Sequence, residues 1–535
     1  MSVLEMQKLE RASFPEEVGV DTYVLRDFFE ELKSTNYRFK NIMVLRHGKV
    51  VAECTKYPFV NQMPHTMFSF SKSVTSIAIG FAISEGLLRL DTTLEELFGD
   101  SYDEKNLKKI EGITVRHLLT MTAGKKVSLF ANKEKNDWLD IFVKSKRFAE
   151  PGEKFEYISE NTYVLGRMLA KVSGLTISEY LRPRFFEPLG IDVKFWEKDK
   201  LGFDAGGWGL FFTIEDMAKL TTCMLQNGKW HGVQVIPEGW VEAMTTPYIR
   251  DLYGLDAQNL GYGYNTWCGR YDGYYRIEGL YAQFSFVYPV QDGCVVVSSS
   301  DITHKAIYDL VDKYFPHAFN ETMIKPSDDV LDEFNELLNS FSYDVLPVSP
   351  RNLATEEGIE GNCYRFRPNS VYTMLPVSAA FTLAVKPGYM NNMSFNFSEN
   401  YAEISWDENN SPRNTLCVNF DGKRRVSTIT FNDMTIHMLA FGAWKHDNTL
   451  DVQVFTMEVP EIRSLNFKFN KNKVKVTNYL SPNIYETLDN KYRFEGWKTN
   501  IILDTVAKIV NVLGRKLFVP PVKKGKIIKN YKSEE

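Results

Sequence analysis

Phe68–Ser76 reads FSFSKSVTS and joins a β-rich segment to a helical one. Before it, residues 41–55 form two β-rich runs that meet at His47-Gly48, which predicts a hairpin and the beginning of a sheet. After it, Gly86 stands where a helix would stop, and apolar residues recur at helical spacing, at Val74, Ile77, Ala78, Phe81 and Ala82. The stretch therefore marks the point where a sheet passes into a helix.

Within this stretch, Ser69 and Lys72 form an SxxK motif at the start of the predicted helix. Residues three apart on a helix face the same side, so the hydroxyl and the amine can share a proton. A serine hydroxyl is a poor nucleophile until a base takes its proton, and a lysine acts as that base only in surroundings that disfavour its charge. The apolar neighbours Phe68, Phe70 and Val74 offer such surroundings. The start of a helix also favours an oxyanion at the Ser69 N–H.

The motif alone leaves a structural alternative open, in which Ser69 is only a helix N-cap and Lys72 a solvated residue of the first turn. A motif with two specified positions recurs by chance about once or a few times in a chain of this length. No second SxxK occurs in the sequence, and this one stands between a sheet and a helix. The context therefore favours the nucleophile interpretation.

Helical signals dominate the segment that follows. TVRHLLTMTAG predicts a helix capped by Thr114 and ended by Gly124, and TIEDMAKLTTCMLQNG predicts one capped by Thr213 and ended by Gly228. Strand character returns with FSFVYPVQDGCVVVSSS, which has a turn at QDG. We therefore predict an α/β sandwich over residues 1–320, an antiparallel sheet flanked by helices with strands from both ends of the segment.

The rest of the chain divides into three parts. Residues 321–355 predict a helical linker, because DDVLDEFNELLNSF is helical and Pro347 and Pro350 follow it. Residues 356–495 alternate between β-branched or aromatic and polar residues, which predicts an antiparallel β domain that can close into a small barrel. Turns are expected there at Asn409-Asn410, Asp421-Gly422 and Asn470-Lys471. Residues 496–535 predict a docking helix over 500–513 and a solvated basic tail, with a membrane-surface anchor as the weaker alternative.

Composition limits the function classes. The chain has 535 residues, 44% of them hydrophobic, and a formal net charge of -5, so nucleic acid and anionic membrane are not expected partners. Neither a secretory leader nor a membrane-spanning stretch is recognised, which predicts a cytoplasmic protein. The six cysteines and eight histidines lack metal-ligand spacing, so we expect reduced thiols, no metal and no cofactor. The oligomeric state stays open.

Over residues 15–315 the chain resembles the serine β-lactamase and penicillin-binding-protein superfamily, in its class C β-lactamase and esterase branch. The resemblance is carried, in order, by FSFSKSVTS, EGLLRLDTTLEELF, ITVRHLLTMTAG, PGEKFEYISENTYVLG, AGGWGLFFTIEDMAKL, GWVEAMTTP and GLYAQFSFVYP. Within this branch it is most similar to 6-aminohexanoate-dimer hydrolases and related esterases. The resemblance implies a β-lactamase-like α/β fold. It also implies that Ser69 is the nucleophile and Lys72 its base.

The family's second motif matches Tyr157-Ile158-Ser159, which implies that Tyr157 shares the proton transfers with Lys72 and that Ser159 contacts substrate. Which of the two is the base stays open. Without its flanking motif, Tyr157 would be interpreted as a core aromatic. Trp138, Trp208 and the aromatic run 271–275 are candidate pocket walls, with core packing as the commoner role of such residues.

The family's third motif, KTG or HxG, matches Ile277-Glu278-Gly279, so the usual cation is missing. Gly279 is retained for close approach to substrate, and the resemblance implies Leu280 N–H as the oxyanion donor beside Ser69 N–H. Arg276 is expected on the opposite face, because neighbouring strand residues alternate. Ala282-Gln283 stands where many relatives have GxxGQ, and Gln283 is a candidate substrate contact.

The sequence therefore predicts a serine hydrolase that cleaves a small ester, amide or D-amino-acid peptide through a seryl acyl-enzyme. β-Lactamase activity is the least expected member of the family's repertoire, because the cation that holds a substrate carboxylate is absent. The alternative from another class is a non-catalytic or weakly catalytic sensor or binding protein with this fold, whose β domain contacts a ligand or partner.

Overall fold

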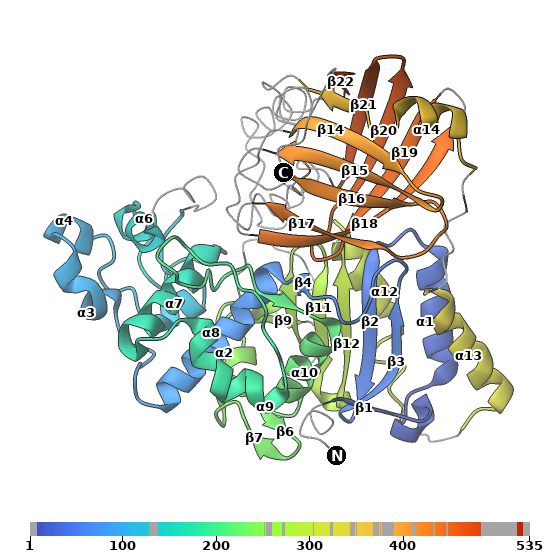
Figure 1. Ribbon diagram of the computed structural model, residues 1–535. Helices are drawn as coiled ribbons and strands as arrows, with labels where there is room; N and C mark the ends of the chain where they lie inside the picture. The colour runs from blue at the N-terminus through green and yellow to red at the C-terminus, as the bar shows by residue number, and fades with distance from the viewer. Residues whose placement is uncertain are drawn as a thin grey trace. The chain divides into compact units, whose positions relative to one another are not determined.

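The computed structural model describes most of the chain, in two compact units, of which the first extends to Ser342 and the second follows it (Figure 1). The described residues are 8–127, 137–250, 252, 259–269, 273–302, 304–320, 325–342, 348, 350–366, 374, 376, 390–408, 413–431, 434–445, 448–482 and 522–527.

An eight-stranded sheet forms the centre of the first unit, with strand order β1-β3-β2-β12-β11-β10-β9-β8. The strands are β1 (Glu10–Arg11), β2 (Phe39–Arg46), β3 (Lys49–Thr55), β8 (Asn259–Tyr262), β9 (Trp267–Gly269), β10 (Tyr275–Gly279), β11 (Gln283–Tyr288) and β12 (Gly293–Ser299). Two short pairs lie outside it, β4 (His65–Thr66) with β5 (Phe211–Phe212) and β6 (Lys229–Trp230) with β7 (Val233–Gln234). The sheet is mixed rather than wholly antiparallel as predicted, because β1 pairs with β3 in parallel.

Helices cover both faces of this sheet, as an α/β sandwich requires (Figure 1). Along β12, Cys294 and Val296 pack into one core, and Val295 and Val297 into another on the opposite face. The first core includes α2, α7 and α10, and the second includes α1, α12 and α13.

The helical segments of this unit have the following bounds: η1 (Pro15–Val18), α1 (Thr22–Ser34), η2 (Phe68–Phe70), α2 (Ser71–Ser84), α3 (Leu94–Phe98), η3 (Gly99–Ser101), α4 (Glu104–Leu107), α5 (Val115–Leu119), α6 (Trp138–Lys144), α7 (Ser159–Ser173), α8 (Ile177–Leu181), η4 (Arg182–Phe186), α9 (Glu187–Leu189), α10 (Ile214–Leu225), α11 (Trp240–Thr245), η5 (Pro289–Gln291), α12 (His304–Tyr314) and α13 (Asp328–Ser340).

Most of the predicted local signals are confirmed. The β2–β3 turn lies at His47 and Gly48, both with positive φ, and α10 begins at the N-cap Thr213 with a capping box. The helix predicted up to Gly124 is shorter, because α5 ends at Leu119. Met121 takes a φ of 58°, a left-handed conformation that a continuing helix does not allow.

The helix predicted as part of the linker, α13, packs on the first unit. Its Phe334 and the following Phe341 join the core that α1 supplies with Phe28 and Phe29. The Phe29 ring lies 6.1 Å from that of Phe334 and 6.2 Å from that of Phe341, between centroids. An amphipathic helix that buries its apolar side here is part of the domain rather than a free spacer.

The second unit is a closed β-barrel, which confirms the predicted β domain. Its strands follow the order β16-β15-β14-β13-β22-β21-β20-β19-β18, and a parallel pairing of β16 with β18 closes the ring. The remaining pairings are antiparallel, and β17 adds to β18. The elements are α14 (Leu353–Ile359), β13 (Cys363–Arg365), β14 (Met390–Phe397), β15 (Tyr401–Glu408), β16 (Asn414–Asn419), β17 (Val426–Phe431), β18 (Met434–Lys445), β19 (Thr449–Thr456), β20 (Ile462–Asn470), β21 (Lys473–Ser481) and β22 (Val522–Ile527).

The prediction of a solvated tail is wrong for its first residues, because Val522–Ile527 forms β22. This strand pairs with β13 on one side and with β21 on the other. The lysine-rich composition of these residues is not typical of a strand, although they complete the barrel wall. The Asn409-Asn410 turn, the helix over 500–513, the tail beyond 527, Pro347 and residues 271–272 lie outside the described residues.

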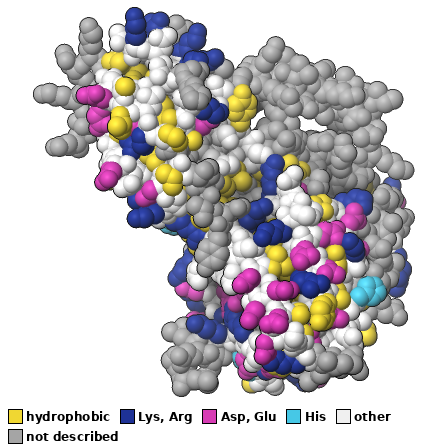
Figure 2. Space-filling model, turned by 90° about the vertical axis from the view of Figure 1, so that its right-hand side faces the viewer, with side chains coloured by type: hydrophobic (Ala, Val, Ile, Leu, Met, Phe, Trp, Pro, Cys, Tyr) yellow, Lys and Arg dark blue, Asp and Glu magenta, His cyan; other side chains and the backbone are white. Residues whose placement is uncertain are grey.

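The described residues contain no helix that is long and apolar enough to cross a bilayer. Figure 2 shows acidic and basic side chains intermixed on the face of the first unit that carries α1 and α13. This distribution agrees with the small net charge of the sequence and gives that face no single-sign field.

A core substitution tests the layered packing. Leu45 on β2 is 1% exposed within the first core, so Leu45→Ala should lower the free energy of unfolding by about 2–5 kcal/mol, through lost burial and a residual cavity. Leu201 is 50% exposed, so Leu201→Ala should change it by no more than about 0.5 kcal/mol. Urea unfolding followed by circular dichroism measures both. Equal losses in the two variants would contradict the assigned layers.

Candidate active site

Ser69 and Lys72 are positioned by a tight turn that leads into α2. Ser69 is the middle residue of η2, and Lys72 lies in the first turn of α2. The turn is pinned by Met67 N–H, which donates to Leu210 O at 2.7 Å, and by the Ser71 hydroxyl, which donates to Phe68 O at 2.7 Å. Phe68 has a φ of 47°, a conformation that a bulky residue adopts only under constraint from its surroundings. Half-buried Ser69 therefore stands on a strained turn.

The Lys72 side chain is 1% exposed and is surrounded by oxygen atoms. Its Nζ donates to Ser69 Oγ at 2.7 Å, to Ser159 Oγ at 2.9 Å and to Gly207 O at 2.9 Å. The predicted serine–lysine pair is thus in direct contact, inside the protein rather than in solvent. A buried amine that touches a hydroxyl at this distance can exchange a proton with it.

Ser159 and Gly207 reach Lys72 from two other elements. Ser159 is the first residue of α7, and Gly207 belongs to the segment AGGWG before β5. A Cβ at Gly207 would lie 2.5 Å from Ser159 O, so only glycine permits this approach of the two backbones. The Thr75 hydroxyl of α2 donates to Gly206 O at 2.9 Å and holds the segment against the helix.

Tyr157 also lies beside Lys72. The Lys72 Nζ lies 4.9 Å from the centroid of the Tyr157 ring, which is 9% exposed. The ring packs on Trp267 at 5.2 Å and on Tyr262 at 6.0 Å, within an apolar cluster that also contains Phe155. Burial raises the pKa of Tyr262 well above its usual value, so that neighbour stays a neutral phenol. Tyr157 is therefore both a packed aromatic and a neighbour of the amine.

Gly279 brings the end of β10 against the Ser69 turn. A Cβ there would lie 2.2 Å from Met67 O and 3.2 Å from Phe70 N. Leu280 follows directly and is partly exposed. Among the described backbone hydrogen bonds, none uses the N–H of Ser69 or of Leu280, so both donors remain available to an oxygen. Backbone donors of this kind, near a nucleophile, are what an oxyanion hole requires.

Gln283, a predicted substrate contact, is engaged by the protein itself. It is 2% exposed, and its amide nitrogen donates to Tyr281 O at 3.1 Å and to Ser299 O at 2.7 Å. Its amide oxygen accepts from Ser298 Oγ at 3.1 Å and from Ser299 N at 3.4 Å. These bonds tie the turn after Gly279 to β12. The Gln283 amide therefore positions the turn after Gly279 and does not face a substrate.

Trp208, a predicted pocket residue, is 3% exposed in the first core. Its ring stacks on that of Trp138 with centroids 5.5 Å apart, and its carbonyl accepts from Trp196 Nε1 at 2.9 Å. It adjoins Gly207, which holds Lys72. Trp208 therefore packs in the core next to Gly207 and helps to hold the carbonyl that contacts Lys72.

Arg276 does not supply the missing cation of the third motif. Position 277, where the family has it, holds Ile277 in the first core. Arg276 and Glu278 point to the opposite face, as predicted from strand alternation. There Arg276 Nε donates to Glu278 Oε2 at 2.7 Å, and the Tyr308 hydroxyl of α12 donates to the same oxygen. His304 Nδ1 lies 3.3 Å from Glu278 Oε1.

Sequence reasoning missed Gly207, whose contribution to the site is a backbone carbonyl. The only signal was the GGWG run inside a stretch that matches the family. It also missed the strain at Phe68, and the positive φ of 61° and 60° at Tyr281 and Ala282 beside Leu280. A left-handed non-glycine residue leaves no mark on the residue type, so the sequence could not show it.

An α/β fold in which helices cover both faces of a sheet, with a serine and a lysine in contact at the start of a buried helix, is that of a β-lactamase-like serine hydrolase. The chain belongs to the Beta-lactamase family, whose model matches residues 38–306, half of its length.

Two sequence relatives and one solved structure are similar to this chain. The 6-aminohexanoate-dimer hydrolase of Paenarthrobacter ureafaciens is 26% identical over 294 residues, which are 48% of this chain and 71% of that protein. A β-lactamase of Escherichia coli (strain K12) is 27% identical over 186 residues, 31% of this chain and 48% of that protein. The crystal structure of SurE is 16% identical, covers 80% of this chain and 96% of its own, and has a TM-score of 0.47. The family, the dimer hydrolase and the β-lactamase support a hydrolase.

The buried cluster behind β10 gives a pH test. Burial alone would raise the pKa of Glu278, but Arg276, His304 and Tyr308 together lower it from 4.5 to about 2. The charged carboxylate therefore stabilises the fold above pH 4.5, and this stabilisation is lost as the pH falls toward 2. Glu278→Gln should lower the free energy of unfolding by roughly 3 kcal/mol at pH 7.

The difference in the free energy of unfolding between wild type and Glu278→Gln should decrease by about 1.4 kcal/mol for each pH unit below 4.5. Urea unfolding at pH 7, 4.5 and 3.5 measures it. Glu238 is exposed, and Glu238→Gln provides the control, with no comparable loss at any of these pH values. A difference that does not change with pH would mean that the Glu278 carboxylate carries no such charge interaction.

Proposed function

We propose that this protein is a serine hydrolase in which Ser69 attacks the carbonyl carbon of a small ester or amide. The observation that carries the proposal is the buried Lys72 Nζ, 2.7 Å from Ser69 Oγ. In this step Lys72 is the neutral amine: its two N–H groups donate to Ser159 Oγ and Gly207 O, and its lone pair accepts the Ser69 hydroxyl proton as the new C–O bond forms. The contact with Ser159 Oγ and Gly207 O keeps the amine aimed at Ser69 throughout.

The negative charge that develops on the carbonyl oxygen is stabilised by the N–H groups of Ser69 and Leu280. Gly279 supports this assignment, because its lack of a Cβ lets the end of β10 approach the Ser69 turn. Donors that are already in place cost no reorganisation when the tetrahedral intermediate forms.

Collapse of the intermediate requires a proton on the leaving group. Tyr157 and Lys72 supply it, with Ser159 completing the group of hydroxyls around the amine. In the second half of the reaction the same groups take a proton from water, which attacks the acyl carbon and releases Ser69. No metal or cofactor has a place in these steps, since each proton is carried by a side chain.

The substrate class follows from the third motif. Ile277 replaces the cation that holds a substrate carboxylate in many relatives, so we propose a neutral acyl group in an ester, an amide or a D-amino-acid peptide. A relative is named for hydrolysis of the 6-aminohexanoate dimer, which favours an amide. The second candidate, a weakly catalytic binding protein, is favoured by this same replacement.

Covalent labelling tests the nucleophile. A fluorophosphonate probe should add one adduct to the wild-type chain, detected by intact mass, and none to Ser69→Ala, because the reactive oxygen is removed. Lys72→Ala should label at least about 100-fold more slowly, since the proton acceptor is lost.

Lys171→Ala is the matched control, because this exposed lysine lies on α7, the helix that begins with Ser159. It should label at the wild-type rate. Adduct on Ser69→Ala would contradict Ser69 as the nucleophile. No adduct and no hydrolysis of p-nitrophenyl esters by the wild type would favour the binding protein.

Leaving-group chemistry tests Tyr157. Tyr157→Phe keeps the ring that packs on Trp267 but removes the proton donor, so kcat should fall by about 100-fold for an anilide. For a p-nitrophenyl ester, whose leaving group needs no proton, acylation should fall much less. Tyr23 of α1 is 48% exposed, and Tyr23→Phe is the control. No loss for either substrate would mean that Tyr157 only packs, and equal losses for both would contradict its role as the proton donor of the leaving group.

A further inference from the structure

Exposed cations from three strands gather on the outer face of the barrel. They form what we call the cationic patch: Arg365 of β13, Lys473 and Lys475 of β21, and Lys524 and Lys526 of β22. In the barrel wall β22 lies between β13 and β21, and Figure 1 shows β21 and β22 side by side. The alternate residues Val474, Val476 and Gly525 are buried, so the five cationic side chains share the outward face.

The strand register places like charges directly opposite one another. Lys524 pairs with Lys475, and Lys526 pairs with Lys473 on one side and with Arg365 on the other. Residues that oppose each other on neighbouring strands have Cβ atoms about 4.5–5.5 Å apart, and like charges at this spacing destabilise a sheet. The patch therefore lowers the stability of the barrel unless an anion from outside the chain neutralises it.

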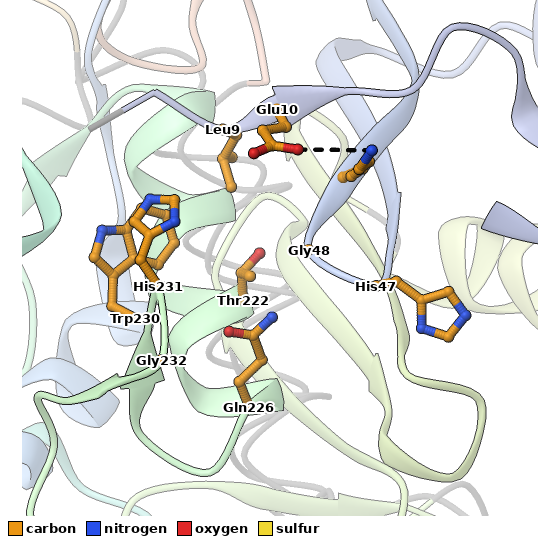
Figure 3. A pocket seen from close by; sticks show the side chains of 10 residues that line it. Leu9, Glu10, His47, Gly48, Thr222, Gln226, Trp230, His231 and Gly232 are labelled. Carbon is orange, nitrogen blue, oxygen red and sulfur yellow. Dashed lines mark ion pairs between the residues drawn. The ribbon is translucent and has the colours of Figure 1, made fainter. Parts of the chain in front are cut away.

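The neighbouring strands do not offset this charge. β13, β20, β21 and β22 contain no Asp or Glu, and among the described residues none of the five cations forms an ion pair. Elsewhere in the barrel Arg413 pairs with Asp407 at 2.6 Å. In the first unit, the dashed line in Figure 3 marks the pairing of Glu10 with Lys49, 3.6 Å apart on the wall of a cavity. The cationic patch departs from this pairing, and such departures are typical of functional surfaces.

The charge of the chain is unevenly distributed between its two parts. Over the whole sequence Asp and Glu outnumber Lys and Arg, 68 to 63, whereas from residue 343 onward Lys and Arg outnumber Asp and Glu. The field near one face depends on the charges of that face rather than on the sum over the chain. The net charge of -5 therefore does not describe the surroundings of the cationic patch.

We propose that the cationic patch binds the surface of an anionic lipid membrane, where its ammonium and guanidinium groups contact the charged headgroups. Clusters of about four to eight Lys or Arg are typical of surfaces that bind phosphatidylserine or phosphoinositide headgroups. This binding does not depend on the proposed hydrolysis.

The shape of the patch favours a membrane over a nucleic acid. The outer wall of a closed barrel is convex, so it can rest on a plane of headgroups. A single nucleic acid strand is instead bound in a groove that follows its backbone, with aromatic rings that stack on the bases. None of the five patch residues is aromatic. The exposed Tyr479, on the same face of β21 as Lys475, suits the membrane–water interface, where tyrosine is enriched.

Vesicle sedimentation tests the proposal with the full-length protein. The protein should sediment at low ionic strength with vesicles of phosphatidylcholine and phosphatidylserine, three to one, and not with vesicles of phosphatidylcholine alone. Salt at about 0.5 M should weaken this binding at least tenfold, because it screens exposed charges. Equal binding to both kinds of vesicle, or binding to neither, would overturn the proposal.

Charge-removing variants test the patch itself. Lys475→Gln and Lys524→Gln should each weaken vesicle binding about fivefold, since a lysine near an anionic surface contributes about 1 kcal/mol. Lys423→Gln is the matched control and should bind as the wild type does. Lys423 is also exposed, on the turn after β16, and β13, β14 and β15 separate β16 from β22. An equal loss in the control would mean that only the total charge matters, which contradicts a localised patch.

A charge reversal separates binding from folding. Lys524→Glu should raise Tm at low ionic strength, because it places an opposite charge across from Lys475. The same variant should bind the phosphatidylserine vesicles at least about tenfold more weakly. A lower Tm for Lys524→Glu than for the wild type would mean that these lysines do not repel one another, and would contradict the proposal.

Competition with single-stranded RNA tests the other class of polyanion. At equal phosphate concentration and low ionic strength, oligouridylate should not displace the protein from the phosphatidylserine vesicles, because the patch has no ring on which a base can stack. Displacement by oligouridylate that is lost in Lys475→Gln would assign the patch to nucleic acid and overturn the membrane proposal.

Discussion

The contact between the Lys72 amine and the Ser69 hydroxyl, 2.7 Å apart and out of solvent, is the interaction on which the first unit is organised. A buried amine is tolerated only when oxygen atoms surround it, and here they come from α2, from the start of α7 and from the carbonyl of Gly207. Three segments that are distant in the sequence must therefore meet at one nitrogen. The left-handed backbone of Phe68 and the missing Cβ of Gly207 allow the three segments to come this close.

The two faces of the sheet have different tasks around β10. Tyr275 and Ile277 pack toward α2 and the site, while Arg276 and Glu278 are held on the other face by α12. Gln283 then ties the turn after Gly279 to β12. The hydrogen bonds of Glu278 and those of the Gln283 amide thus both hold the strand end that carries the Leu280 N–H. These groups support the site without contacting it. Position 278 accepts a charged residue because Arg276 and Tyr308 pair with it on the α12 face.

Local patterns predicted most of the first unit. The hairpin at His47-Gly48, the helix after Ser69 and the capped start of α10 depend on neighbours within a few residues, so the sequence shows them. The end of α5 and the strand β22 depend on distant partners: Met121 turns away from the helix, and 522–527 takes its place only between β13 and β21. The role of Gln283 was misjudged for the same reason, since the atoms that occupy its amide belong to another strand.

The sequence by itself determined that Ser69 and Lys72 share one helical turn, because a three-residue spacing is a local constraint that any α-helix satisfies. The family motifs placed Tyr157 and Ser159 as candidates. Only the tertiary structure decided that a backbone carbonyl completes the lysine's surroundings, that Ile277 packs in the first core, and that a lysine-rich strand completes the barrel wall. Backbone groups are the same at every residue, so which of them meets a side chain depends on packing alone.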